Sequence, residues 1–477
     1  MSPASRFGRN NSLALSRENP IALARRRSTL GDLSVPENPN SRRLSIGVWL
    51  ALWAVCTVLS LGIRARPRTT PLEDDEIYWI GSSYYYDLAF VRHDWRSPDW
   101  QLLPARENPP VAKYLIGLGL ATTGQHVASP DLLGCFYSMF ASVPGAWGTG
   151  TDYAKRAAVV ARMTPEFRDK LRNARQINLA PELLTPPRMA MIGCAVLASL
   201  LVFLFGQRAL SGPAGLLASQ ALLLHPVVVE AYNHALSDAV TLIFSTAAAV
   251  VTFHWTARFM ASSPTRFARV ALAVLGGALL ALACGSKMNS LVIVALAGLS
   301  LAFVALRAWR QSDHGRIAQV LFFGGGLFAT ALAVFIAINP TILHDVAGGL
   351  AATVTEHRQT ETLQVQFMQG HLETLAQKFS AVATMTAFSQ IAFGVLAIYA
   401  AWCLASARLG VRFVAGWWLL AWVCVGVWIP FSRLRYVMPL IVPTVLLGAA
   451  LLETAVMIAA SRIRKTHLPA KSAIGAS

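Results

Sequence analysis

Ten stretches of the sequence are long and apolar enough to cross a lipid bilayer as helices. The first, residues 44–63, carries no charge and lies between Arg43 and Arg64. Its length matches a hydrocarbon core of roughly 30 Å. The others lie near residues 189–205, 214–229, 239–254, 270–284, 288–306, 317–338, 381–404, 413–430 and 437–460. Because lipid offers the backbone no hydrogen-bond partner, we expect an all-α polytopic membrane protein with about ten transmembrane helices.

Composition agrees with this class. Only 14% of the residues are charged, against about 25% in soluble domains. The six cysteines show no Cys-x-x-Cys or Cys/His spacing, so no zinc site is predicted.

The arginines predict how the chain is threaded. Cytoplasmic loops of membrane proteins are enriched in Lys and Arg, and ten spans place the Arg-rich N-terminus, alternate short loops and the C-terminal tail on one side. The arginines of those loops are Arg208, Arg258, Arg266, Arg269, Arg307, Arg310, Arg316, Arg408 and Arg412. We therefore predict a multi-pass protein of the plasma (inner) membrane with both termini in the cytoplasm.

This threading divides the chain into segments. We expect a disordered cytoplasmic tail at 1–43, extracytoplasmic loops at 64–188 and 339–380, a transmembrane bundle at 189–338, three last transmembrane helices at 381–460 and a cytoplasmic tail at 461–477. The apolar segment 112–124 is too short for a span, so we interpret it as an interfacial or re-entrant helix within the first loop. The basic N-terminal tail could contact anionic lipid or nucleic acid, but we favour its role in fixing orientation and predict no nucleic-acid partner.

Ionisable residues gather at the predicted extracytoplasmic end. The acidic stretch "EDDE" follows the first span, and the other groups are Lys113, His234, Asp238, Lys287, Arg433 and Arg435. Each has a structural alternative, such as a helix cap or an interfacial anchor, but charges at that depth are costly and usually functional. Cations there could hold a phosphate, while a carboxylate could accept the proton of a hydroxyl. We also expect crowding among the four acids to raise the pKa of at least one.

The order of these motifs resembles the GT-C superfamily, the membrane glycosyltransferases that use polyprenyl-phosphate sugars. The likeness is to protein O-mannosyltransferases and to the bacterial aminoarabinose and Rgt-type transferases. It is carried by Asp75 and Glu76 after the first span, "ENPPVAKYLIGLGL", "NHALSDAVTLIF", "CGSKMNSL" and "SRLRYVMPLIVP". Three departures stand out: Asn108 occupies a position where His is common, His234 one where Arg is common, and the insertion at about 128–184 has no counterpart.

The resemblance implies roles for individual residues. Asp75 would be the catalytic carboxylate, with Glu76 beside it. The resemblance also implies that Lys113, Lys287 and Arg435 help bind the donor phosphate. From its place at the same end of the bundle we predict that Arg433 joins them, and that the substrates also contact Asp74, Tyr78, Asn108, His234, Asp238 and Tyr436.

We therefore predict an enzyme that moves a sugar from a polyprenyl-phosphate carrier to an acceptor hydroxyl on a glycan, lipid or protein, with inversion and with Asp75 as general base. No cofactor is expected to be obligatory, although the acidic cluster could hold Mg²⁺ or Mn²⁺. The alternatives are a transporter or lipid-linked-sugar flippase without transferase chemistry, and a receptor or scaffold. A flippase would place polar groups near the bilayer midplane, where this sequence has few.

Overall fold

The structure is a computed structural model that describes residues 45–467 except 142, 144, 174–178, 263, 368–370 and 407. The predicted tail at 1–43 and the last part of the C-terminal tail, 468–477, lie outside the described residues.

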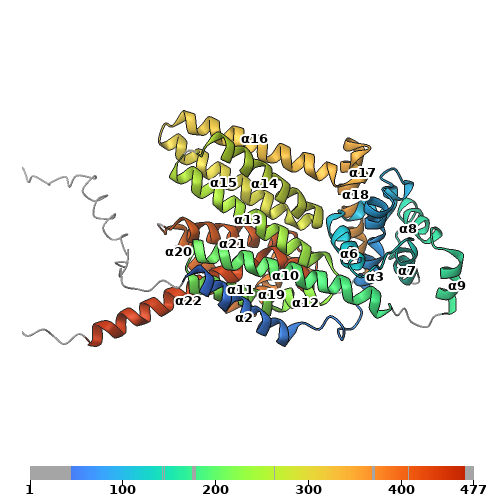
Figure 1. The fold of residues 1–477 in the computed structure, drawn as a ribbon, viewed down its shortest axis with the longest axis horizontal. Helices are drawn as coiled ribbons and strands as arrows, with labels where there is room; N and C mark the ends of the chain where they lie inside the picture. The colour runs from blue at the N-terminus through green and yellow to red at the C-terminus, as the bar shows by residue number, and fades with distance from the viewer. Residues whose placement is uncertain are drawn as a thin grey trace, which may run out of the picture. The chain divides into compact units, whose positions relative to one another are not determined.

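Membrane-length helices form most of the described chain (Figure 1). By length and composition, the described residues contain eight single spans: α2 (Ile46–Arg64), α10 (Pro181–Ala209), α13 (Ser237–Ala261), α14 (Arg266–Ser286), α15 (Leu291–Arg310) with the preceding short helix η3 (Met288–Ser290), α16 (His314–Ala337), α21 (Leu409–Trp428) and α22 (Met438–His467) with the preceding short helix η4 (Leu434–Val437). The total is up to ten if two bent helix pairs each count as one span. The predicted all-α polytopic fold is confirmed.

Two of the predicted runs are the bent pairs. Between α11 (Gly212–Leu224) and α12 (Pro226–Asn233) the chain turns by 58°, because Pro226 lacks an N–H and forces His225 into an extended conformation. Between α19 (Leu375–Ala387) and α20 (Gln390–Leu404) it turns by 89°, where Phe388 is left-handed with φ 61°. Neither pair is the straight span that the hydropathy pattern suggests.

The predicted loops fold into short helices that lie at one end of the bundle, on the right in Figure 1. The first loop forms α3 (Asp74–Ser82), α4 (Tyr84–Tyr86), η1 (Asp87–Val91), η2 (Pro98–Gln101), α5 (Leu103–Glu107), α6 (Val111–Ala121), α7 (Asp131–Met139), α8 (Thr151–Ala161) and α9 (Pro165–Asn173). The second forms α17 (Pro340–Leu343) and α18 (Val346–Phe367). With 11 residues, α6 is too short to cross a bilayer, in agreement with its interpretation as a non-spanning helix.

The unmatched insertion is an integral part of this end. Its helix α7 packs on α3, α8 packs on α7 and α5, and α18 from the second loop packs on α5. Helix α10 begins at Pro181, earlier than the predicted span. The prediction began later because the first turns of the helix are too polar for a hydropathy search to include.

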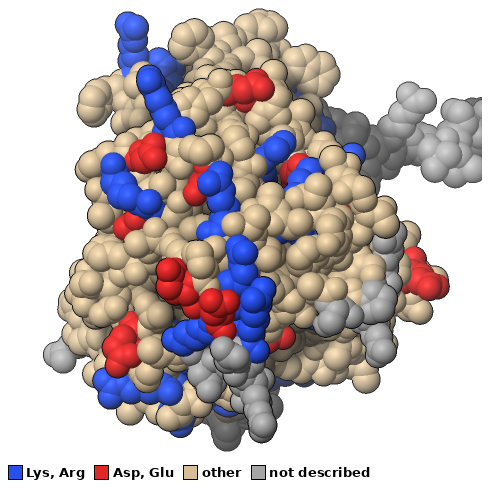
Figure 2. All heavy atoms as spheres, turned by 90° about the vertical axis from the view of Figure 1, so that its right-hand side faces the viewer, with Lys and Arg blue, Asp and Glu red and all other residues tan. Residues whose placement is uncertain are grey.

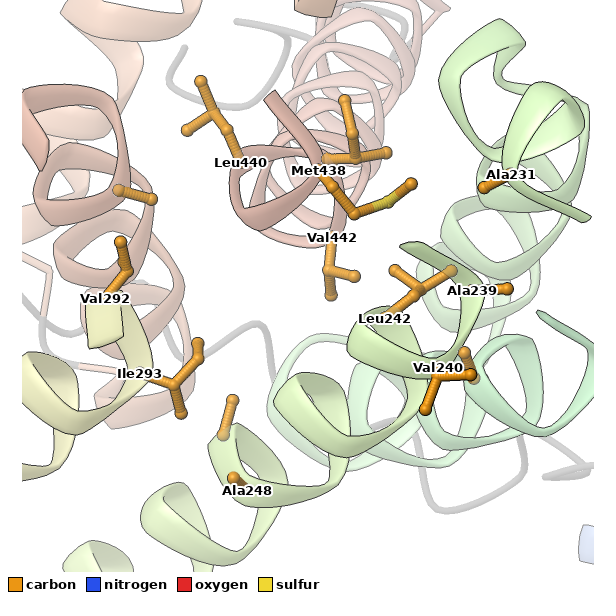
Figure 3. Close-up of a cluster of buried hydrophobic side chains, with 14 of the residues drawn as sticks. Ala231, Ala239, Val240, Leu242, Ala248, Val292, Ile293, Met438, Leu440 and Val442 are labelled. Carbon is orange, nitrogen blue, oxygen red and sulfur yellow. The ribbon is translucent and has the colours of Figure 1, made fainter. Parts of the chain in front are cut away.

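Below the loop helices lies an apolar core formed by the first turns of several spans (Figure 3). Ala239, Val240 and Leu242 from α13, Val292 and Ile293 from α15, and Leu440 and Val442 from α22 are buried there. Polar residues stand just before this core, in the first two positions of α13 and in the short helices η3 and η4 that precede α15 and α22. The apolar core thus fixes the position of these helix starts, and the polar residues lie between the core and the loop helices.

Candidate active site

A cavity lies where α3, α5, α7, α8 and α18 meet the start of α13 and the turns before α15 and α22. It encloses about 1320 Å³, counting the part open to solvent. Figure 2 looks onto this end of the bundle and shows acidic and basic side chains intermixed on it. The cavity therefore combines charge of both signs with aromatic walls.

The centre of the cavity is an ion pair between residues 360 positions apart in the sequence. Arg435, in η4, donates through Nη1 to Oδ2 of Asp75, in the first turn of α3. Both side chains are partly exposed, at 27% for Asp75 and 16% for Arg435. The structure thus brings together the carboxylate and one of the cations that the sequence predicted to meet, and leaves both accessible to a ligand.

A second ion pair lines the same cavity. The Lys287 Nζ atom lies 2.8 Å from Oδ1 of Asp238, which begins α13 and is almost fully buried. Beside this pair are two polar groups that the sequence analysis missed. Within the described residues, the Ser237 hydroxyl and both amide atoms of Asn289 are buried without a hydrogen-bond partner. Such groups are normally satisfied, so their presence in a cavity wall favours a polar ligand.

Arg433 and Tyr436 complete this side of the cavity. The Arg433 side chain is exposed and forms no ion pair with any other described residue. Tyr436 is held by edge-on contact with Trp428, at 5.6 Å between ring centroids. Within the part of the chain that the structure describes, Arg433 is therefore a cation without an ion-pair partner, although its charge acts on the nearby Glu230 carboxylate.

Helix geometry adds to the positive potential. The first two residues of α13, Ser237 and Asp238, line the cavity, so the N-terminus of that helix ends there. The unpaired N–H groups of a helix N-terminus carry partial positive charge and favour anions. The same effect explains the acidic stretch, because Asp74, Asp75 and Glu76 form the first turn of α3 and Glu73 caps it through a reciprocal capping box with Glu76.

Glu76 does not reach the cavity, contrary to the expectation that it acts beside Asp75. Its carboxylate is completely buried and accepts two hydrogen bonds from Arg188, at 2.6 and 2.8 Å. His234 Nδ1 and the Ala235 backbone N–H contact the same carboxylate, at 3.1 and 2.7 Å. Arg188 in turn donates to the carbonyls of Pro67, Thr70 and Pro71. This cluster ties the start of α3 to α10 and α12.

The expected upward shift of an acid's pKa is wrong for Glu76. Burial alone raises the pKa, but the hydrogen bonds from His234, Arg188 and two backbone N–H groups outweigh it and lower it from 4.5 to about 2. Crowding among the acids is therefore relieved by cations and N–H groups that the sequence pattern did not place.

Lys113 is also placed differently from the expectation. Its side chain is buried, and its ammonium donates to the carbonyl oxygens of Pro104 and Asn108, the latter at 2.6 Å, below the ring of Tyr85. Burial, partly opposed by the charge of Glu107, lowers its pKa from 10.5 to about 7. Lys113 does not line the cavity, and its contacts hold the turn between α5 and α6.

Some of the other predicted site residues line the cavity, and others do not. Tyr78 and Asn108 line the cavity, and the Asn108 amide donates to the Tyr78 hydroxyl at 2.9 Å. His234 contacts Glu76 instead of the cavity, and Asp74 is exposed on α3 without lining the cavity.

The far wall contains residues that the sequence analysis did not select. Glu107 ends α5, and its Oε2 accepts a hydrogen bond of 2.9 Å from the Tyr137 hydroxyl on α7. Arg156 from α8 and Thr360 from α18 also line this wall. Glu107 stands inside the motif "ENPPVAK", so it could have been found there, but no local pattern marks Tyr137 or Arg156.

The acids do not form a metal site. Asp75 faces Arg435, Glu76 faces Arg188 and Asp74 is exposed, so their carboxylates point in different directions. Across the described ranges, no group of three or more His, Cys, Asp and Glu side chains is placed to hold a metal ion. Accordingly we derive no step through Mg²⁺ or Mn²⁺, and independence from metal stays a prediction.

Comparisons with solved structures give distant matches. ArnT from Cupriavidus metallidurans bound to undecaprenyl phosphate is 15% identical, with a TM-score of 0.48 over 90% of this chain and 66% of that one. The archaeal oligosaccharyltransferase AglB from Archaeoglobus fulgidus, in complex with an inhibitory peptide and a dolichol-phosphate, is 13% identical, with a TM-score of 0.46 over 90% of this chain and 53% of that one. The chain thus spans roughly half to two thirds of these proteins, and at these scores neither match assigns a residue's role.

Among curated proteins, no sequence match was found. Residues 187–347 match the family model described as dolichyl-phosphate-mannose-protein mannosyltransferase. That stretch is about a third of the chain and includes Asp238 and Lys287 but not Asp75 or Arg435. Over that stretch, the match confirms the predicted resemblance to the protein O-mannosyltransferases.

Proposed function

We propose that the protein transfers a sugar from a polyprenyl-phosphate carrier to an acceptor hydroxyl. The observation that carries the proposal is the Asp75/Arg435 pair, in a cavity that also presents Lys287 and the unpaired Arg433. A carboxylate beside several cations provides one group to take a proton and others to hold a departing phosphate. The family match supports a lipid-phosphate donor.

Each residue has a distinct part in the proposed reaction. Asp75 accepts the proton of the acceptor hydroxyl, whose oxygen forms a bond to the anomeric carbon of the sugar. The bond between that carbon and the phosphate oxygen breaks on the opposite side, so the configuration inverts and polyprenyl phosphate leaves. Arg433, Arg435 and Lys287 stabilise the charge on the leaving phosphate, together with the N-terminus of α13.

The unpaired groups beside Lys287 support a phosphate position there. The Asn289 amide and the Ser237 hydroxyl can each donate a hydrogen bond to a phosphate oxygen. Such an anion would also compete with Asp75 for Arg435. Donor binding would then free the Asp75 carboxylate for the acceptor hydroxyl, which couples proton acceptance to the presence of the donor.

The membrane side of the reaction is proposed from the arginine pattern alone. Because the loops on the opposite side of the predicted membrane are rich in arginine, the cavity would face the extracytoplasmic space. Membrane lipids would surround the transmembrane bundle.

A reconstituted transfer assay tests the proposal. The full chain in lipid nanodiscs is incubated with undecaprenyl phosphate carrying radiolabelled glucose, mannose, galactose or arabinose, and with membrane extract as the acceptor source. The wild type should release free undecaprenyl phosphate from at least one donor, and Asp75→Asn should lower the rate about 10²- to 10⁴-fold while its unfolding temperature stays near that of the wild type.

Full activity of Asp75→Asn would overturn the assignment of the base. Movement of labelled donor across liposomes, without transfer, would instead support the flippase alternative. Lipid and glycan profiling of a deletion strain would name the donor, because the unused sugar-lipid should accumulate.

A further inference from the structure

The cavity has a second polar centre, apart from Lys287, Arg433 and Arg435, on the wall where the unmatched insertion and α18 meet α5. Glu107 is its central group. Its carboxylate accepts hydrogen bonds from the hydroxyls of Tyr137 and Thr360, and Arg156 provides a positive charge nearby. No part of the proposed proton transfer or phosphate binding uses these residues.

Glu107 has hydrogen-bonding capacity left over. A carboxylate offers about four acceptor positions, and two neutral hydroxyls occupy two of them. Burial raises its pKa because the charged form loses solvation. A ligand that donates further hydrogen bonds would compensate for this loss, whereas a hydrocarbon chain would not.

Aromatic rings surround this polar centre. Phe136 lies edge-on to Tyr78, with 5.2 Å between ring centroids, and Trp147 donates through its indole N–H to the Tyr137 carbonyl at 2.9 Å. These side chains line the cavity on both sides of Glu107. A sugar ring has an apolar face of C–H groups and an edge of hydroxyls, so rings next to a carboxylate match both of its surfaces.

The polar centre is continuous with the reacting end. Asp75 and Tyr78 lie about one turn apart on α3, and the Tyr78 hydroxyl accepts a hydrogen bond from Asn108, the neighbour of Glu107. A group bonded to a phosphate at Arg433 and Arg435 could thus extend past Asp75 toward Glu107.

We propose that Glu107, positioned by Tyr137 and Thr360, binds the hydroxyls of the donor sugar, and that the insertion at 128–184 determines sugar specificity by forming this wall. The inference rests on the proposed function. Because Arg156 offsets the charge of Glu107, the subsite selects a neutral sugar with adjacent hydroxyls, not a uronic acid or an amino sugar. Tyr137 is a positioning residue, since it acts through the carboxylate.

Equilibrium binding measurements separate the contribution of the sugar to affinity from that of the phosphate. The affinity of the full chain in nanodiscs is measured for undecaprenyl phosphate alone and for the same lipid carrying glucose, mannose, galactose, arabinose, glucuronic acid or 4-amino-4-deoxyarabinose. Glu107→Gln should weaken binding of the preferred neutral sugar-lipid roughly 10- to 100-fold and leave binding of the bare lipid within about twofold. Tyr137→Phe should have a smaller effect of the same kind.

Two surface variants are matched controls. Glu166 is exposed on α9, and Tyr153 is exposed on α8 beside Trp147 outside the cavity lining. Glu166→Gln and Tyr153→Phe should bind both lipids like the wild type. Thermal unfolding of each variant shows whether it has folded.

The inference is overturned if folded Glu107→Gln binds the sugar-lipid as tightly as the wild type, if it loses affinity for both lipids equally, or if a charged sugar binds best. The proposed function fails separately, if the wild type binds neither bare undecaprenyl phosphate nor any of its glycosides.

Discussion

Two neighbouring acids on α3 meet opposite environments. Glu76 is fully buried and contacts Arg188, His234 and two backbone N–H groups, whereas Asp75 is partly exposed and forms an ion pair with Arg435 in the cavity wall. Successive residues on an α-helix point about 100° apart, so one turn of α3 serves both surfaces. The comparison shows two roles for a carboxylate beside an arginine. When the carboxylate is buried and its hydrogen-bond positions are filled, it stabilises the fold. When its arginine can bind another anion instead, the carboxylate is available to a substrate.

The largest effect on stability is expected when the buried pair is broken. Arg188→Met leaves the Glu76 carboxylate buried without its cation and removes donors from three carbonyl groups. The free energy of unfolding should fall by about 3–5 kcal/mol, measured by thermal or denaturant unfolding in detergent. Asp75→Asn is the comparison and should change stability by less than about 1 kcal/mol. Equal losses in the two variants would contradict the distinction.

Acid should weaken the same cluster. The pKa of Glu76 is about 2 in the folded protein and about 4.5 when unfolded, so its ionised form stabilises the fold above pH 4.5. That contribution, about 3 kcal/mol, should be lost as the pH falls from 4.5 toward 2. Unfolding of the wild type and of Glu76→Gln at stepped pH checks this, because the variant lacks the titrating group. A pH dependence that is identical in both would assign the acid sensitivity to other groups.

Arg435 should matter for the ligand more than for the fold. Arg435→Gln is expected to weaken binding of bare undecaprenyl phosphate by about tenfold, since a charge-assisted contact to phosphate is lost, while its unfolding temperature stays within a few degrees of the wild type. Equilibrium binding in nanodiscs measures the first and thermal unfolding the second. The prediction is contradicted if Arg435→Gln is unstable but binds bare undecaprenyl phosphate normally once its fold is stabilised.

The smallest effect is expected at Asp74. It is exposed and interacts mainly with the N-terminus of α3, so Asp74→Asn should lower the free energy of unfolding by about 0.5 kcal/mol. Transfer from the sugar-lipid should stay within about twofold of the wild type. A large loss of transfer would place Asp74 in the site that the sequence analysis originally gave it.

The spans were predictable because hydrocarbon imposes a length and a composition that a sequence displays directly. The bends in two of the spans were harder to predict from the sequence. Pro226 is visible in the sequence, but nothing in the hydropathy pattern marks the left-handed conformation of Phe388. The early start of α10 was also missed, because its first turns are polar and a hydropathy search does not include them.

The cavity was predictable in part. The order of motifs identified Asp75, Asp238, Lys287 and Arg435, which the structure brings to one cavity. It could not separate Asp75 from Glu76, because burial is a tertiary property and adjacent residues share every local signal. In the far wall, Glu107 stands inside the motif "ENPPVAK" and could have been found, whereas Tyr137 and Arg156 were beyond reach, because their placement depends on contacts of the insertion with α5 and α18.

The central claim is that Asp75 acts on the substrate while Arg435 and its neighbours hold the phosphate. The most direct test compares donor binding with transfer in Asp75→Asn, using the same labelled sugar-lipid for both. The account predicts that the variant binds the donor at least as tightly as the wild type, because Arg435 is released from its carboxylate, and that its transfer rate falls about 10²- to 10⁴-fold. A parallel loss of binding and transfer would contradict it and make Asp75 a structural partner of Arg435.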